Sequence, residues 1–109
     1  MTVNSELIAI ELTLRHHGPV YYGDDTTATR IAEDWQDYGF SDRQVDQWCK
    51  AYCWEPSVAD EFRNAGMSAD AADRACKLFD ERYGGDSMYA VCNEDLDAQS
   101  VISFYKANG

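Results

Sequence analysis

The hydrophobic positions between Ala28 and Phe79 follow one pattern that occurs twice. Residues 32–50 and 59–77 align at an offset of 27 positions without a gap, and alanine, glycine, serine, cysteine and lysine recur at matching places. A large apolar residue precedes the glycine by four positions in both copies. A repeat of this kind usually means that one supersecondary unit is used twice.

Each copy predicts two helices joined by a tight corner. In the first copy, apolar residues at helical spacing lead to Gly39, a residue type that commonly ends a helix in the left-handed conformation. Ser41 and Gln44 then have the spacing of a capping box that starts the next helix. Gly66 and Ser68 repeat the stop and the start in the second copy. The expected helices cover residues 27–38, 42–53, 57–65 and 69–82.

Residues 4–17 allow two interpretations. Polar helix-starting residues stand at one end, and a basic cluster followed by Gly18 and Pro19 stands at the other, which favours a helix. Apolar and polar residues nevertheless alternate along this segment, so a strand stays open as the alternative for residues 6–15.

Two short stretches, 20–22 and 88–92, are rich in aromatic and β-branched residues and predict a small two-stranded β ribbon. Asn93 is expected to cap a last helix. The predicted fold is therefore α+β and predominantly α-helical, with about five or six helices. We expect a single domain over residues 1–109.

The composition supports a folded core. The chain has 109 residues, of which 45% are apolar and 13% aromatic, and we expect Trp35, Phe40, Trp48 and Phe62 inside the core. No apolar run approaches the roughly 20 residues that span a membrane. The N-terminus lacks the basic region of a signal peptide, so we expect a cytoplasmic protein without a membrane partner.

The sequence offers few candidates for catalysis. His16 and His17 stand at a predicted helix end, where they suit the helix dipole, and no nucleophile or oriented acid accompanies them. Glycine-rich phosphate loops and metalloprotease signatures do not occur. The four cysteines are too few and too irregularly spaced for a disulfide framework. They could form a zinc site only together with His16 or His17, and no CxxC or HxxxH spacing supports one, so we expect them to be free and mostly buried. We therefore predict a protein that is not an enzyme and uses no cofactor or metal.

The repeated corner is similar to the helix-turn-helix of DNA-binding proteins, which leaves a regulator of that type as one alternative. Trp35 and Phe62 occupy a place that is normally small in that family. Asp42 and Asp46 would lie on the recognition helix, and a protein with a net charge of −11 is repelled by a phosphate backbone. Direct binding of nucleic acid is therefore not expected.

The negative charge is concentrated in two segments. Residues 24–46 hold seven acids against two bases, residues 80–97 hold six against one, and the rest of the chain is nearly neutral. An ordinary solvated surface would explain such segments, but carboxylates on rigid helices can also occupy the sites that a basic protein uses for phosphates. The candidate partner-binding residues are Asp24, Asp25, Glu33, Asp34, Asp37, Asp42, Asp46, Glu94, Asp95 and Asp97.

A short acidic chain with these two segments and without a catalytic motif resembles the small inhibitors that phages use against bacterial defence. Anti-CRISPR proteins and antirestriction DNA mimics are the types it is similar to. The resemblance implies a viral protein in the cytoplasm of a bacterial host. Such a protein would bind the basic nucleic-acid-binding surface of a defence protein, for example a CRISPR effector subunit, and block access of DNA by charge mimicry. The other alternative is an acidic immunity or antitoxin protein that neutralises a basic toxin. A monomer and a small homo-oligomer are both compatible with the sequence.

Overall fold

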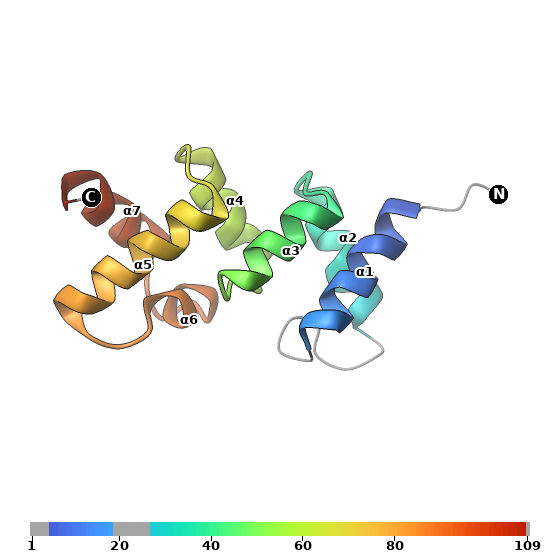
Figure 1. Ribbon diagram of the computed structural model, residues 1–109, viewed down its shortest axis with the longest axis horizontal. Helices are drawn as coiled ribbons and strands as arrows, with labels where there is room; N and C mark the ends of the chain where they lie inside the picture. Colours follow the sequence, from blue (N-terminus) through green and yellow to red (C-terminus); the bar gives the residue numbers. More distant parts are fainter. Residues whose placement is uncertain (1–4, 19–26, 109) are drawn as a thin grey trace. The chain divides into compact units, whose positions relative to one another are not determined.

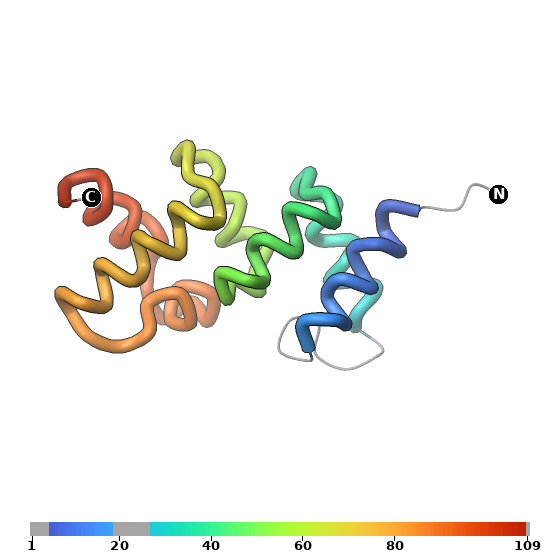
Figure 2. Tube along the Cα trace, in the orientation of Figure 1, coloured from blue at the N-terminus to red at the C-terminus, as the bar shows by residue number. Residues whose placement is uncertain are grey.

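The structure is a computed structural model that describes residues 5–18 and 27–108, and all regular secondary structure in these residues is helical. The chain divides into two compact units, Met1–Lys50 and Ala51–Gly109, which Figures 1 and 2 colour along the sequence from blue to red. The first unit contains α1 (Ser5–His17), α2 (Ala28–Asp37) and α3 (Asp42–Lys50). The second contains α4 (Pro56–Asn64), α5 (Ala69–Tyr83), α6 (Ser87–Cys92) and α7 (Ala98–Asn108).

Helix α1 packs against both α2 and α3 (Figure 1). Ile10 and Leu14, four residues apart, are fully buried, whereas Ile8 and Leu12 are exposed. The N–H of Gly18 donates to the Leu14 carbonyl at 3.2 Å and ends the helix. The strand alternative for residues 6–15 is therefore wrong, because burial follows the helical spacing rather than the alternation.

Both copies of the repeat end their first helix with the same hydrogen bonds. The N–H of Phe40 donates to the Trp35 carbonyl at 3.1 Å after α2, and the N–H of Met67 donates to the Phe62 carbonyl at 3.0 Å after α4. The intervening glycine has a φ of 85° in the first copy and 81° in the second. This is the Schellman termination, in which a left-handed glycine turns the chain out of the helix.

The second helix of each copy begins with the predicted serine cap. The Ser41 Oγ accepts from the Gln44 N–H at 3.2 Å, and the Gln44 Oε1 accepts from the Ser41 N–H at 2.9 Å, which completes the capping box. The Ser68 Oγ accepts from the Ala71 N–H at 3.2 Å. The second copy has no reciprocal bond, because alanine stands in the place of Gln44.

Replacing Ser41 by alanine should lower the free energy of unfolding by about 1 kcal/mol, because it leaves the Gln44 N–H at the start of α3 without its side-chain acceptor. Ser68→Ala should cost about as much, since one bond of the same kind is lost there. Urea denaturation measures both values, with the exposed helical residue Ser100, changed to alanine, as the control. An effect of Ser41→Ala no larger than that of Ser100→Ala would contradict the role of the box.

The first unit has an aromatic core. The rings of Trp35 and Phe40 meet edge to face with centroids 5.1 Å apart, and those of Phe40 and Trp48 do so at 6.4 Å. Trp35 and Phe62 are fully buried, and Phe40 and Trp48 are at most 4% exposed. All four aromatic residues expected in a core are therefore confirmed as buried, Trp35, Phe40 and Trp48 in the first unit and Phe62 in the second.

In the second unit, α5 contacts α4, α6 and α7 (Figure 2). Its buried residues include Ala69, Ala72 and Ala75, whose small side chains let other helices approach closely. Further along α5, the ring of Phe79 meets that of Phe104 on α7 at 5.5 Å. Helix α5 is therefore the element around which this unit is assembled.

The prediction of a β ribbon is wrong for its second strand, residues 88–92. Residues 20–22 lie outside the described residues, and residues 88–92 belong to helix α6. The Asp86 carboxylate caps this helix by accepting from the Tyr89 N–H at 3.2 Å. Met88, Val91 and Cys92 are buried at helical spacing, so capping and burial outweigh the β propensity of the segment.

The end of the chain also differs from the prediction. Asn93 closes α6 instead of starting the last helix, and the Asp97 Oδ1 takes that role for α7 by accepting from the Gln99 N–H at 3.0 Å. The described residues thus form seven helices rather than five or six. Within residues 5–18 and 27–108, no helix has the length and apolar character that crossing a membrane requires.

Candidate partner-binding surface

The candidate acids are distributed over both units. Asp24 and Asp25 lie outside the described residues. The first unit holds Glu33, Asp34 and Asp37 on α2 and Asp42 and Asp46 on α3. The second unit holds Glu94, Asp95 and Asp97 between α6 and α7.

Glu33, Asp34 and Asp37 form what we call the acidic face of α2. All three are exposed, and in the described part of the chain none of them forms an ion pair. Asp37 lies one turn after both Glu33 and Asp34, at spacings where like charges cost a few tenths of a kcal/mol per pair. They also stand towards the C-terminal end of the helix, and the last turn holds no base to balance the negative end of its dipole. The acidic face therefore costs stability.

The carboxylate of Asp46 contacts two side chains of the same unit, His17 and Lys50. It accepts from His17 Nε2 at 2.6 Å and lies 3.0 Å from Lys50 Nζ, so it ties the end of α1 to α3. These two hydrogen bonds, that of His17 first, hold the pKa of Asp46 below its ordinary value. The contact with His17 spans 29 positions and is not visible from charge alone. The sequence indicates this contact only through the position of His17 in the last turn of a predicted helix.

Asp42 also has a place in the fold. It stands in the first turn of α3, where a carboxylate suits the helix dipole, and its N–H donates to the Glu6 carboxylate at 2.8 Å. The Asp46 carboxylate and the main-chain N–H of Asp42 thus join α1 to α3, whereas the Asp42 carboxylate serves the dipole of its own helix.

The pH dependence of stability should reveal the Asp46 contacts. A carboxyl group with a lowered folded-state pKa stabilises the fold above its unfolded pKa, near 3.9, and loses that contribution as the pH falls through the folded value. Wild type should therefore exceed Asp46→Asn in stability at pH 6, and the difference should shrink as the pH falls below about 4. Urea denaturation across this range measures it. Parallel stability curves for the two proteins would contradict the assignment.

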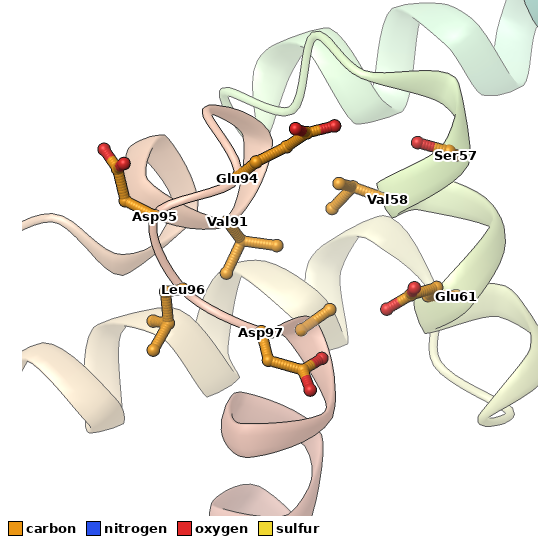
Figure 3. A pocket seen from close by; sticks show the side chains of 9 residues that line it. Ser57, Val58, Glu61, Val91, Glu94, Asp95, Leu96 and Asp97 are labelled. Carbon is orange, nitrogen blue, oxygen red and sulfur yellow. The ribbon is translucent and has the colours of Figure 1, made fainter.

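The second group of acids surrounds a hollow of about 330 Å³ in the second unit, which Figure 3 shows. We call it the acidic hollow. The carboxylates of Glu61 and Asp97 point toward one another across it, and Glu94 reaches toward the Ser57 side, whereas Asp95 points away (Figure 3). The lining residues are Ser57, Val58, Glu61, Val91, Glu94, Asp95, Leu96, Asp97 and Ala98, and none of them is basic.

The acids of the hollow differ in their local roles. Asp97 caps α7, and the Asp95 carboxylate accepts from the Asn93 side-chain amide at 3.2 Å. Glu94 has a φ of 63°, in the left-handed region that residues other than glycine rarely adopt. Glu61 was missed by the sequence argument because it belongs to a nearly neutral segment. Only the packing of α4 beside the α6–α7 connection brings it to the other acids.

The described residues give no sign of a metal site at these acids. Within that part of the chain, no group of three or more His, Cys, Asp or Glu side chains could hold a metal ion. All four cysteines are free and buried, as expected. Burial raises the pKa of Cys49 to about 12 and that of Cys76 to about 11, so both remain protonated at neutral pH.

Comparison with protein-family models, with curated proteins and with solved structures gives no match. Among the candidate acids in the described residues, the acidic face of α2 and Glu94 have no ion pair or side-chain hydrogen bond, and those are the ones that a partner would explain.

Proposed function

We propose that this protein is a non-enzymatic inhibitor that binds the basic nucleic-acid-binding surface of a bacterial defence protein, such as a CRISPR effector subunit, and blocks access of DNA. Its carboxylates take the places of phosphates in the partner's groove. The protein acts in the cytoplasm of the bacterial host and belongs to a phage or a similar mobile element.

The observation that carries this proposal is the acidic face of α2. Exposed acids that merely keep a protein soluble are tolerated anywhere on its surface, and helix stability favours them in the first turn. Here three acids are placed next to one another near the unfavourable end of the helix. Selection for a binding surface explains an arrangement that costs stability better than selection for the fold does.

The mode of binding follows from the same residues. Exposed carboxylates gain little from a single surface ion pair, but several of them facing a basic groove steer association and are matched by several lysines or arginines at once. The acidic hollow adds carboxylates around an apolar floor of Val58, Val91 and Leu96. A lysine or arginine side chain fits such a hollow, with its aliphatic stem on the floor and its charge at the rim.

The proposal is tested with the protein as bait in a lysate of a bacterium that carries defence systems. Captured proteins are released by a salt gradient and identified, and each nucleic-acid-binding protein among them is then purified. The binding of that partner to a fluorescent DNA duplex is measured with increasing amounts of the inhibitor. We expect competitive loss of DNA binding, and weaker inhibition at higher salt because exposed charges are screened.

Two results would contradict the proposal. One is a partner that binds DNA equally well in the presence of saturating inhibitor. The other is capture of a basic toxin whose activity, rather than its DNA binding, is neutralised, since that outcome indicates an immunity protein.

A further inference from the structure

Two of the four cysteines face each other in the second unit. The Sγ atoms of Cys53 and Cys92 lie 3.7 Å apart, although the residues are 39 positions apart in the sequence. Cys53 is fully buried and Cys92 is 5% exposed. The distance is that of a thiol–thiol hydrogen bond, and a disulfide would bring the two sulfurs to about 2.05 Å.

The surroundings of Cys92 favour its thiolate. The hydrogen bond with Cys53, with smaller contributions from the backbone N–H groups of Trp54 and Glu55, lowers the pKa of Cys92 in spite of its burial. The thiols of Cys49 and Cys76 are buried as well, but burial raises their pKa values. Because the thiolate is the nucleophile in thiol chemistry, Cys92 is distinguished from the other buried cysteines.

We propose that Cys53 and Cys92 are a redox-sensitive pair that a peroxide converts into an intramolecular disulfide. The Cys92 thiolate attacks one oxygen of hydrogen peroxide, which forms a sulfenic acid and releases hydroxide. The Cys53 sulfur then attacks the Cys92 sulfur and loses its proton, and the sulfenic hydroxyl leaves as water. The two sulfurs are oxidised by two electrons in total, and the peroxide is reduced to two molecules of water.

The new bond would link the two segments that carry the acidic hollow. Cys53 precedes α4, which supplies Ser57 and Glu61, and Cys92 precedes the connection with Glu94 and Asp97. Oxidation would therefore join the start of the segment that carries Ser57 and Glu61 to the start of the segment that carries Glu94 and Asp97. A cross-link over 39 positions also restricts the unfolded chain, so the oxidised protein should be the more stable form.

The test starts from the full chain, fully reduced and freed of reductant, and exposed to increasing hydrogen peroxide under native conditions. The reaction is quenched in acid, free thiols are alkylated in denaturant, and the unreduced digest is analysed by mass spectrometry. We expect a Cys53–Cys92 cross-link as the main product, with Cys49 and Cys76 alkylated. The melting temperature of the oxidised protein should rise by at least about 5 °C and return after reduction.

Matched variants separate this pair from the other cysteines. Cys49→Ser combined with Cys76→Ser should leave both the cross-link and the rise in melting temperature unchanged. Cys53→Ser should abolish the cross-link and leave Cys92 as a sulfenic acid that dimedone traps. A main cross-link between any other pair, or full oxidation of Cys92 to sulfinic acid in the wild type without a cross-link, would overturn the proposal.

Discussion

Replacing Phe62 by alanine should lower the free energy of unfolding by about 3–5 kcal/mol, which is among the largest losses that a single substitution in this chain can cause. Phe62 is fully buried at the end of α4, and its carbonyl also receives the hydrogen bond that closes the helix. Two contributions add up in this loss. The protein no longer gains the free energy of burying the phenyl ring, and the substitution leaves a cavity that the surrounding residues fill only in part. Urea denaturation followed by far-UV circular dichroism measures it without depending on tryptophan fluorescence.

Trp35 holds the equivalent position in the first copy, and it allows a sharper comparison. Its side chain is fully buried, and in the described part of the chain its Nε1–H has no hydrogen-bond partner. Trp35→Ala should cost about 3–5 kcal/mol, as Phe62→Ala does. Trp35→Phe should cost far less, because the smaller ring leaves a cavity but removes a buried N–H whose desolvation costs about 1–3 kcal/mol.

The comparison between the two substitutions at Trp35 decides how this site works. A cost of Trp35→Phe within about 1 kcal/mol of zero would mean that the unsatisfied N–H nearly offsets the packing of the indole. A cost as large as that of Trp35→Ala would show instead that the shape of the indole is essential. The second copy already carries phenylalanine at this place, which favours the first result.

The parts of the fold that the sequence predicts well are local. The stop at Gly39 and the cap at Ser41 depend on hydrogen bonds between residues at most five positions apart, so their spacing in the sequence specifies them. The same local rules failed for residues 88–92. There the β propensity of the side chains was the visible signal, whereas the Asp86 cap and the burial of one helical face determined the structure.

From the sequence, the candidate site could be predicted only as two acidic segments, without the role of each acid within them. Counting acids along the chain singled out residues 24–46 and 80–97, but it gave Asp46 the same weight as Asp37. The structure separates them, because Asp46 binds His17 and Asp37 forms no ion pair in the described residues. Glu61 shows the opposite failure. It faces the other acids of the hollow through tertiary packing, which a count along the sequence does not register.

Neutralising the acidic face of α2 should abolish inhibition while leaving the protein at least as stable as the wild type. The variant combines Glu33→Gln, Asp34→Asn and Asp37→Asn, which keep the shape of each side chain and remove only its charge. Binding should weaken at least 100-fold if these carboxylates meet the partner's lysines and arginines together. Stability should rise slightly, because repulsion within the helix and the clash with its dipole both disappear.

The control is a variant with the same change in net charge, made on helix α5 instead of α2. Asp70→Asn, Asp73→Asn and Glu81→Gln remove three charges from α5, where Asp70 lies in the favourable first turn and Asp73 pairs with Lys77. This variant should retain inhibition and be no more stable than the wild type. Loss of binding in both variants would mean that net charge alone attracts the partner. Full inhibition by the α2 variant would place the binding surface elsewhere, because the exposed carboxylates of this helix would then have no function to offset their cost.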